Sequence, residues 1–265
     1  MPVAFFCVYI VARLFPWGIF RMIDLHCHIL PGLDDGPKTW EESLQMARIA
    51  CEDGITTIVA TPHFWPQKYE PTKKQILDKT SEFNRLLTEE KIDVKVLPGA
   101  SIHLHEGLVE GLRSGELMTL NDTGKYVLLE LPHQSVPNIT SLLFRLELAR
   151  IKPIIARPER NREVQKSPSV LEGLCRRGCL LQTTASSFLG TFGDKAKLCA
   201  RTLLWEKEAM LFVATDAHSA RKRPPKFSTA LKRIENMFFF RIDTKALVTD
   251  NPLSVIEGKE IKRGK

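Results

Sequence analysis

The feature that most restricts the fold of this chain is a regular alternation of short apolar runs with amphipathic segments. Seven apolar runs are bounded by turn or polar residues, which is typical of buried strands. They are Ile23–Leu25, Thr57–Ala60, Val94–Leu97, Tyr126–Leu131, Pro153–Ala156, Leu180–Gln182 and Leu211–Thr215. Apolar residues at helical spacing predict helices between them, at Glu41–Glu52, Lys73–Glu90, Thr140–Arg150, Val170–Arg177 and Lys195–Lys207. This order predicts a parallel sheet in one α/β domain, and seven units favour a (β/α)7 barrel over an open sheet.

Composition narrows the class of protein. The 265 residues suffice for one full core, and no linker or repeat divides them. The net charge of +7 is scattered, so acidic substrates are favoured, but no basic and aromatic stripe indicates nucleic acid. Six cysteines without paired spacing predict reduced thiols and a cytoplasmic location. Cys7 and Arg13 have the spacing of a cysteine phosphatase, but no glycine between them can cradle a phosphate, so we regard the match as chance.

The N-terminal segment needs a separate interpretation. Pro2–Ala12 is apolar but too short to cross a membrane as a helix, and it lacks the features of a signal peptide. Met22 directly precedes the first predicted strand. We therefore expect residues 1–21 to be an upstream extension, residues 22–258 to form the domain, and residues 259–265 to be a basic tail. No stable membrane insertion is expected, and a membrane-associated tail is the alternative.

Metal-ligand residues follow the first and the last predicted strand. His26 and His28 are one residue apart, so their side chains project to the same side of an extended chain. Asp216 and His218 repeat this spacing almost two hundred residues later. Imidazole and carboxylate groups from several strand ends are what a metal centre in a barrel needs. The alternative is that these two pairs are unrelated polar residues at strand ends and share no metal.

The other strand exits carry residues of the same kinds. Chance would scatter histidines over helices as well, yet four of the seven follow a strand. The exit residues that can bind a metal or an anion are Asp34, Asp35, His63, Glu130, Arg157, Arg160 and Arg223. The sequence therefore predicts a metal and anion site at the carboxyl ends of the strands.

Five stretches together resemble a known family. They are IDLHCHILPGLDDGPKTWEESL, GITTIVATPH, LNDTGKYVLLELP, RPERNREV and ATDAHSARKRPP. They are similar to the polymerase-and-histidinol-phosphatase (PHP) superfamily, and more closely to the manganese-dependent protein tyrosine phosphatases of bacterial capsule and exopolysaccharide operons. The resemblance extends over about residues 22–258.

This resemblance implies a distorted (β/α)7 barrel with a trinuclear metal centre. It implies that a first metal is bound by His26, His28 and Asp216, and a third metal by Asp35, His63 and His218. Glu130 would bind the second metal, and Arg160 and Arg223 would bind the phosphate, so that Asp35, His63 and both arginines would be catalytic. The implied metal is Mn²⁺, with Fe²⁺ or Zn²⁺ equally suited to these ligands. The implied partner is a phosphorylated bacterial tyrosine kinase with a C-terminal tyrosine cluster, and the sequence leaves a homo-oligomer open.

Two residues depart from the family pattern, and both concern the second metal. Ser101 stands where the family has a bridging glutamate, and Arg157 stands where it has a histidine ligand. A guanidinium repels a metal ion at close range. Our hypothesis is that Arg157 occupies the space of the second metal and pairs with Glu130.

Several residues have a structural interpretation instead. We interpret Asp34 as a turn former before Gly36. His103 and His105 are expected on a surface loop, with compensation for the lost ligands as the alternative. The aromatic residues Phe64, Trp65 and Tyr69 either flank a phosphotyrosine ring or lie on a plain surface loop.

Three functions follow. The first is a metal-dependent protein tyrosine phosphatase that opposes a capsule-synthesis kinase. The second is a catalytically weakened pseudophosphatase that binds phosphotyrosine as a regulator. The third is a phosphatase of a small ester such as histidinol phosphate, which the motifs match less well.

Overall fold

Parallel strands form the centre of the protein. The computed structural model describes residues 21–206, 212–238 and 242–261, and every structural statement below concerns these ranges. Residues 1–20, on which the predicted extension depends, lie outside them, as do Lys207, the expected end of one helix, and residues 262–265 of the expected basic tail. One sheet has the order β1-β2-β4, and the other has the order β3-β5-β6-β7-β8-β9. The strands are β1 (Met22–Cys27), β2 (Ile55–Ala60), β3 (His63–Phe64), β4 (Lys95–Pro98), β5 (Ser101–His103), β6 (Tyr126–Glu130), β7 (Lys152–Ala156), β8 (Leu180–Thr184) and β9 (Phe212–Ala214).

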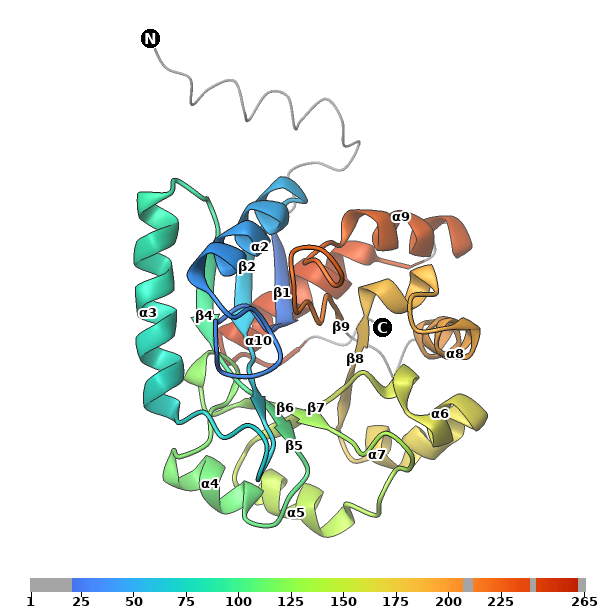
Figure 1. Cartoon of the computed structure of the whole chain (residues 1–265). Coiled ribbons are helices and arrows are strands. Elements are labelled where there is room, and N and C mark those ends of the chain that lie inside the picture. The colour runs from blue at the N-terminus through green and yellow to red at the C-terminus, as the bar shows by residue number, and fades with distance from the viewer. Residues whose placement is uncertain (1–20, 207–211, 239–241, 262–265) are drawn as a thin grey trace.

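Most of the helices lie on the outside of these strands, whereas α10 is seen in the middle of the ring that they form (Figure 1). They are α2 (Trp40–Glu52), α3 (Lys73–Glu89), α4 (Leu108–Ser114), α5 (Thr140–Leu148), α6 (Arg162–Lys166), α7 (Glu172–Arg176), α8 (Asp194–Trp205), α9 (Ser228–Met237) and α10 (Asn251–Ile256). Thr72 and Gln75 form a capping box that fixes the start of α3. A search of the described helices for one long and apolar enough to cross a membrane found none.

The seven predicted strands are confirmed, apart from Leu211, which lies outside the described residues. Four of the five predicted helices agree with the structure to within a few residues, and the fifth is split between a 3₁₀ turn at Pro168–Leu171 and α7. Strands β3 and β5 were not predicted, because two or three residues are too few to show alternation. Helices α4, α6, α9 and α10 were missed as well.

The predicted closed barrel is not confirmed, because the strands separate into two sheets. The breaks fall at Thr61-Pro62 and at Gly99-Ala100, between β2 and β3 and between β4 and β5. Proline has no backbone N–H to donate, and Gly99 passes so close to β2 that a Cβ would lie 2.8 Å from Val59 Cγ1. The end of β1 also meets the segment after β9, through a parallel bridge between Cys27 and Ala217. This bridge brings the two histidine motifs together.

On one face of the strands, buried apolar residues are followed by polar residues at the carboxyl ends. One buried cluster takes alternate residues of several strands, including Tyr126 and Leu128, Leu180, and Phe212. Continuing each strand by two residues on the same face leads from Leu128 to Glu130 and from Leu180 to Gln182. The opposite strand faces, for example at Val127, Leu181 and Val213, are buried in a second cluster together with residues of the helices. Strands buried on both faces therefore hold the polar residues at their carboxyl ends rigidly.

Candidate metal centre

All seven predicted metal ligands lie together at the carboxyl ends of the strands. Their ligand atoms form three groups, each with all atoms within 4.8 Å of one another. The groups are His26, His28 and Asp216; His28, Asp35, His63 and His218; and His63, His103 and Glu130. The first two contain the sets that the resemblance implies for the first and third metals.

The first group has the geometry of a divalent metal site. His26 Nε2 lies 3.1 Å from His28 Nε2 and 3.3 Å from Asp216 Oδ1, and His28 Nε2 lies 3.5 Å from that oxygen. Ligand atoms bound at about 2.1 Å to one ion are about 3.0–3.4 Å apart when their angles at the ion are near those of an octahedron or tetrahedron. Asp216 Oδ1 is buried and has no hydrogen-bond partner. An unpartnered oxygen facing two imidazole nitrogens is suited to bind a divalent cation.

In the group that would hold the third metal (Asp35, His63 and His218), the ligand atoms lie farther apart and one side chain is more exposed. His63 Nε2 and His218 Nε2 each lie 3.6 Å from Asp35 Oδ1, and the Asp35 side chain is half exposed. The buried His218 Nε2 has no hydrogen-bond partner. Burial lowers the pKa of His218 to about 2 and that of His26 to about 3, so both rings are neutral and able to bind a metal.

The four histidines present the same nitrogen to the centre, because an acceptor lies near the other one. His26 Nδ1 lies 2.8 Å from Gln182 Oε1, His28 Nδ1 lies 2.5 Å from Asp34 Oδ2, and His218 Nδ1 lies 2.9 Å from the Asp216 carbonyl. His63 Nδ1 lies 3.1 Å from Glu130 Oε1. The buried His63 Nδ1 makes no hydrogen bond, whereas in a neutral ring the acceptors at Nδ1 of His26, His28 and His218 favour the tautomer in which Nε2 carries the free lone pair. Metal-binding histidines are generally oriented in this way.

Asp34 combines the predicted turn with a second task. Its Oδ1 accepts from the Gly36 backbone, which confirms the turn, and its Oδ2 accepts from the His63 backbone and contacts His28. Burial raises the pKa of Asp34, but the neighbouring His28 outweighs burial and lowers it. Asp34 therefore orients two candidate ligands that follow different strands.

Replacing Asp34 with asparagine is expected to weaken metal binding about 10- to 100-fold, the usual range for loss of such a supporting carboxylate. The amide keeps the size of the side chain, but without the negative charge it forms a weaker hydrogen bond with His28 Nδ1. Metal affinity measured by competition with a fluorescent chelator checks this. Asp78→Asn, on the exposed face of α3, is the control, and equal affinities for both variants would contradict the orienting role.

Three arginines converge on the outer oxygen of Asp216. Arg160 Nη1 lies 2.7 Å from Asp216 Oδ2, Arg157 Nη1 lies 3.4 Å from it, and Arg223 forms an ion pair with it. The Arg160 guanidinium also lies 4.1 Å from the ring centre of Phe192. Burial alone raises the pKa of Asp216, but Arg157, His26, His28 and Arg223 together outweigh burial and hold it well below its usual range. The arginine-lined side of Asp216 suits a phosphate, whose oxygens match guanidinium forks.

The residues of the second site do not fit a metal in the same way. Glu130 Oε2 pairs with Arg157, and Glu130 Oε1 accepts from Ser101 Oγ at 2.5 Å. The expected pairing of Arg157 with Glu130 is therefore present. Both carboxylate oxygens of Glu130 are therefore engaged, and one of them faces a positive charge.

The surface interpretation of His103 is wrong. Its ring is largely buried, and its Nε2 lies 3.0 Å from Glu130 Oε2. Strand β5 continues for two residues beyond Ser101 and pairs with β6, which places His103 in the site. His105 lies beside it, with its ring against Phe64. The signal in the sequence was the position of His103 two residues after Ser101, on the same strand face.

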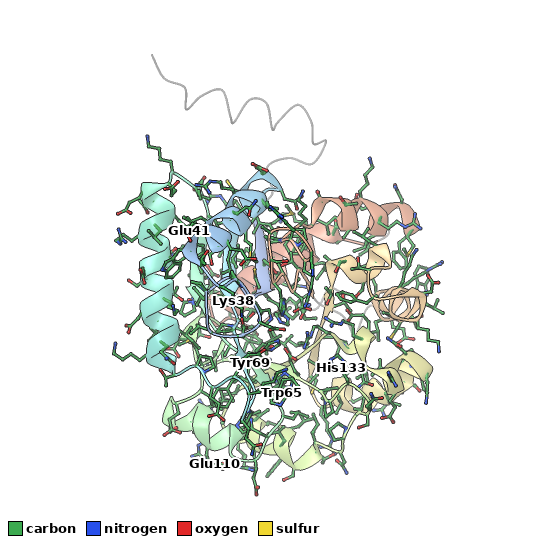
Figure 2. The ribbon with its side chains drawn as sticks, viewed as in Figure 1. Lys38, Glu41, Trp65, Tyr69, Glu110 and His133 are labelled. Carbon is green, nitrogen blue, oxygen red and sulfur yellow. The ribbon has the colours of Figure 1, made fainter. Side chains whose placement is uncertain are left out.

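An aromatic loop borders the centre. Trp65 stacks on His103 with ring centres 4.0 Å apart, and Tyr69 stacks on His63 at 6.1 Å. Trp65 and Tyr69 also pair through a backbone bridge, and Figure 2 shows both side chains near the middle of the view, in front of the strands. The loop places a partly exposed indole next to the candidate ligands.

Comparisons with known proteins identify relatives of this chain. The family model described as capsular polysaccharide synthesis, CpsB/CapC, matches residues 22–257. The tyrosine-protein phosphatase YwqE of Bacillus subtilis is 39% identical over 218 residues, covering 82% of this chain and 85% of the relative. The tyrosine-protein phosphatase CpsB of Streptococcus pneumoniae is 30% identical over 240 residues, covering 89% of this chain and 98% of the relative.

A solved structure shows the same fold. It comes from a study of YwqE and CpsB as metal-dependent tyrosine phosphatases, with a TM-score of 0.86 and 36% identity. The match covers 92% of this chain and 97% of that one. A histidinol phosphate phosphatase from Lactococcus lactis matches with a TM-score of 0.51 and 13% identity, which shows likeness of fold alone. The chain belongs to the CpsB/CapC family of capsular polysaccharide synthesis proteins.

Proposed function

We propose that this protein is a metal-dependent phosphatase that hydrolyses phosphotyrosine on a bacterial tyrosine kinase and thereby regulates capsule or exopolysaccharide synthesis. The observation that carries the proposal is the convergence of four oriented imidazoles and two carboxylates beside Arg160 and Arg223. The names of the relatives YwqE and CpsB support the same activity.

The ligand groups fit two divalent ions. His26, His28 and Asp216 would hold one, and Asp35, His63 and His218 the other, with Mn²⁺, Fe²⁺ or Zn²⁺ suited to these donors. Such ions, when bound, polarise phosphoryl oxygens and lower the pKa of water toward neutrality. Arg160 and Arg223 would bind the remaining phosphoryl oxygens. No cysteine nucleophile is then required.

The aromatic loop suits the ring of the substrate. Trp65 is 38% exposed, and its indole stacks on the ring of His103. Lys68 Nζ lies 4.2 Å from the Trp65 ring centre, where it also offers positive charge to an acidic peptide. We propose that Trp65 and Tyr69 flank the phosphotyrosine ring, which is the first of the two interpretations of this loop.

The test is phosphate release by the full chain, stripped of metal and titrated with Mn²⁺. Phosphotyrosine peptide, phosphoserine peptide and histidinol phosphate are compared at equal concentration. We expect metal-dependent release that is fastest from the phosphotyrosine peptide. Faster turnover of histidinol phosphate would instead favour the small-molecule phosphatase.

One observation favours the second candidate, a weakened enzyme that binds phosphotyrosine as a regulator. Arg157 and Ser101 engage the carboxylate that the family resemblance assigns to the second metal. A metal-loaded protein that binds phosphotyrosine peptide without releasing phosphate would support this role. Restoration of turnover in the double variant Ser101→Glu/Arg157→His would then identify the lost site as the cause.

Three further expectations belong to the same proposal. The two sheets would together form a distorted (β/α)7 barrel, supported by the bridge between Cys27 and Ala217. Residues 22–258 would form one domain, supported by the family match to residues 22–257. The protein would act in the cytoplasm, supported by the six cysteines of the sequence, which have no paired spacing.

A further inference from the structure

We infer that the Arg157 guanidinium takes the place of the second metal ion and provides a third arginine that binds the phosphoryl group. The inference rests on the proposed phosphatase function and extends it to a residue that the family pattern does not contain. It makes the centre a site of two metals and three arginines.

The position of Arg157 supports the replacement. Its Nη2 pairs with Glu130 Oε2, and its Nη1 lies 3.4 Å from Asp216 Oδ2. It therefore bridges the carboxylate of the second site and a carboxylate of the first site, as a shared cation would. These contacts use two of the five N–H donors of a guanidinium, so others remain for a ligand.

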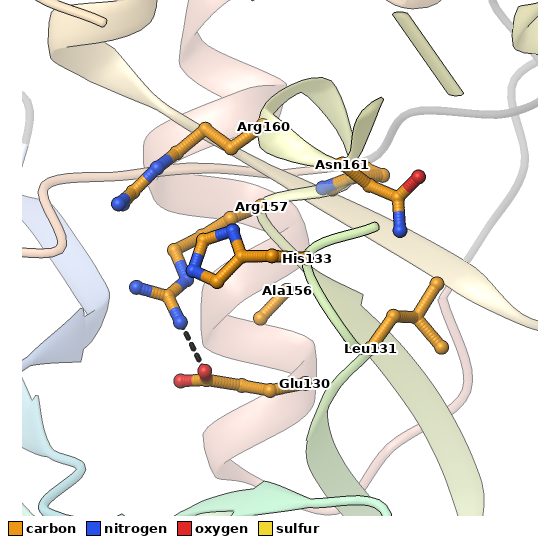
Figure 3. A pocket seen from close by; sticks show the side chains of 8 residues that line it. Glu130, Leu131, His133, Ala156, Arg157, Arg160 and Asn161 are labelled. Atoms are coloured by element: carbon orange, nitrogen blue, oxygen red, sulfur yellow. Dashed lines mark hydrogen bonds and ion pairs between the residues drawn. The ribbon is translucent and has the colours of Figure 1, made fainter. Parts of the chain in front are cut away.

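Arg157 also lines an open pocket. The positively charged or titratable groups on its wall include Arg157, Arg160 and His133. Figure 3 shows the Arg157 guanidinium directed toward Glu130, with Arg160 on its other side. Glu130 is the acid in the wall, and Arg157 already pairs with it. A phosphate entering beside Arg160 would meet Arg157 on the same wall.

The backbone holds Arg157 in this position. Its φ of 52° and ψ of 40° are left-handed, a conformation that costs energy for a residue with a side chain. The Arg157 N–H donates to the Gln182 carbonyl at 2.8 Å, and the Arg157 carbonyl accepts from the Arg160 N–H at 3.0 Å. One turn thus fixes both arginines, and Gln182 of β8, whose carbonyl holds this turn, also contacts His26 through its side chain. A fixed guanidinium binds an anion without first losing conformational freedom.

A rival explanation is a relocated second metal. His63, His103 and Glu130 bring ligand atoms within 4.8 Å of one another, and the buried His63 Nδ1 and His103 Nε2 have no hydrogen-bond partner. Against it, Arg157 contacts the same Glu130 oxygen that His103 approaches, and two cations at that distance repel each other. His63 would also have to use both ring nitrogens as ligands.

The first experiment counts Mn²⁺ per chain by elemental analysis after dialysis. We expect two equivalents in the full chain and three in Ser101→Glu/Arg157→His. The control Arg162→His changes an exposed arginine in the same segment and should keep two equivalents. Three equivalents in the unaltered chain, falling to two in His103→Ala, would establish the relocated metal and overturn the inference.

The second experiment measures the binding of inorganic phosphate to the Mn²⁺-loaded protein by calorimetry. Arg157→Gln keeps a polar side chain but removes the charge, and we expect phosphate affinity to fall about 10- to 100-fold, as for loss of one charge-assisted hydrogen bond. Arg157→Lys should retain part of the affinity. Circular dichroism confirms that each variant folds. Unchanged affinity in a folded Arg157→Gln protein with two metals would refute the phosphate contact.

These measurements separate two kinds of failure. Metal counting and phosphate binding do not require turnover, so they test Arg157 even in a protein that proves inactive on phosphotyrosine. If the protein proved not to be a phosphatase, the expected number of Mn²⁺ ions per chain and the expected affinity for inorganic phosphate would still hold. Three metals in the unaltered chain would remove the role of Arg157 and leave the phosphatase proposal standing.

Discussion

Replacing Asp216 with asparagine is expected to reduce kcat/KM by about 10³-fold or more. Asp216 supports the site on both sides, since Oδ1 faces His26 and His28 and Oδ2 contacts the three arginines. Asparagine removes the negative charge that attracts the first metal. Its NH2 group must also face either the arginines or the metal, and neither can accept a hydrogen bond. One substitution therefore weakens both the metal site and the anion site, and such coupled losses resemble the removal of a whole catalytic group.

The same change is expected to lower the free energy of unfolding by about 3 kcal/mol. Removing one partner of a buried ion pair leaves the other charge buried without compensation, and Asp216 is fully buried. Phosphate release, Mn²⁺ count and urea unfolding measure the three effects. Asp194→Asn, an exposed acid at the start of α8, is the control and should change none of them. An Asp216→Asn protein with normal metal content and activity would remove Asp216 from the first site.

The sequence predicted the strands and most of the metal centre because both depend on local order. A strand followed at once by His26 and His28 can present them only at its carboxyl end, and the same holds for Asp216 and His218. The pairing of Arg157 with Glu130 was also predictable, since a guanidinium close to a carboxylate forms an ion pair. These inferences require only neighbouring residues and the rules of parallel strands.

The parts that sequence reasoning missed depend on contacts between distant segments. His103 enters the site because a break at Gly99-Ala100 lets the chain leave its pairing with β2 and pair with β6, and Gly99 is needed there to pass Val59. Gln182 was read only as a strand end, but its side chain contacts His26 across 156 residues. Asp34 formed the expected turn, yet the position of its second oxygen beside His28 depends on tertiary packing. Closure of the barrel was inferred from the number of units and is not confirmed.

Replacing Arg160 with lysine is expected to lower kcat/KM on phosphotyrosine peptide by about 10²-fold, comparable to the loss of one preorganised donor. Arg160 is held between Asp216 Oδ2, 2.7 Å away, and the ring of Phe192. Lysine preserves the charge but lacks the planar fork that matches two phosphoryl oxygens and stacks on an aromatic ring. If Arg160 binds the phosphoryl group most tightly in the transition state, its replacement should lower kcat by a larger factor than it raises KM.

Steady-state kinetics with the Mn²⁺-saturated protein checks this expectation. Arg162→Lys is the matched control, because Arg162 is exposed at the start of α6. Substitutions at such surface positions typically change stability by less than about 0.5 kcal/mol, and we expect a change in rate of no more than about twofold. If Arg160→Lys raised KM alone with kcat unchanged, Arg160 would act only in binding the peptide. Comparable rates for Arg160→Lys and the control would show that charge alone is sufficient at this position, since the fork geometry would then contribute nothing.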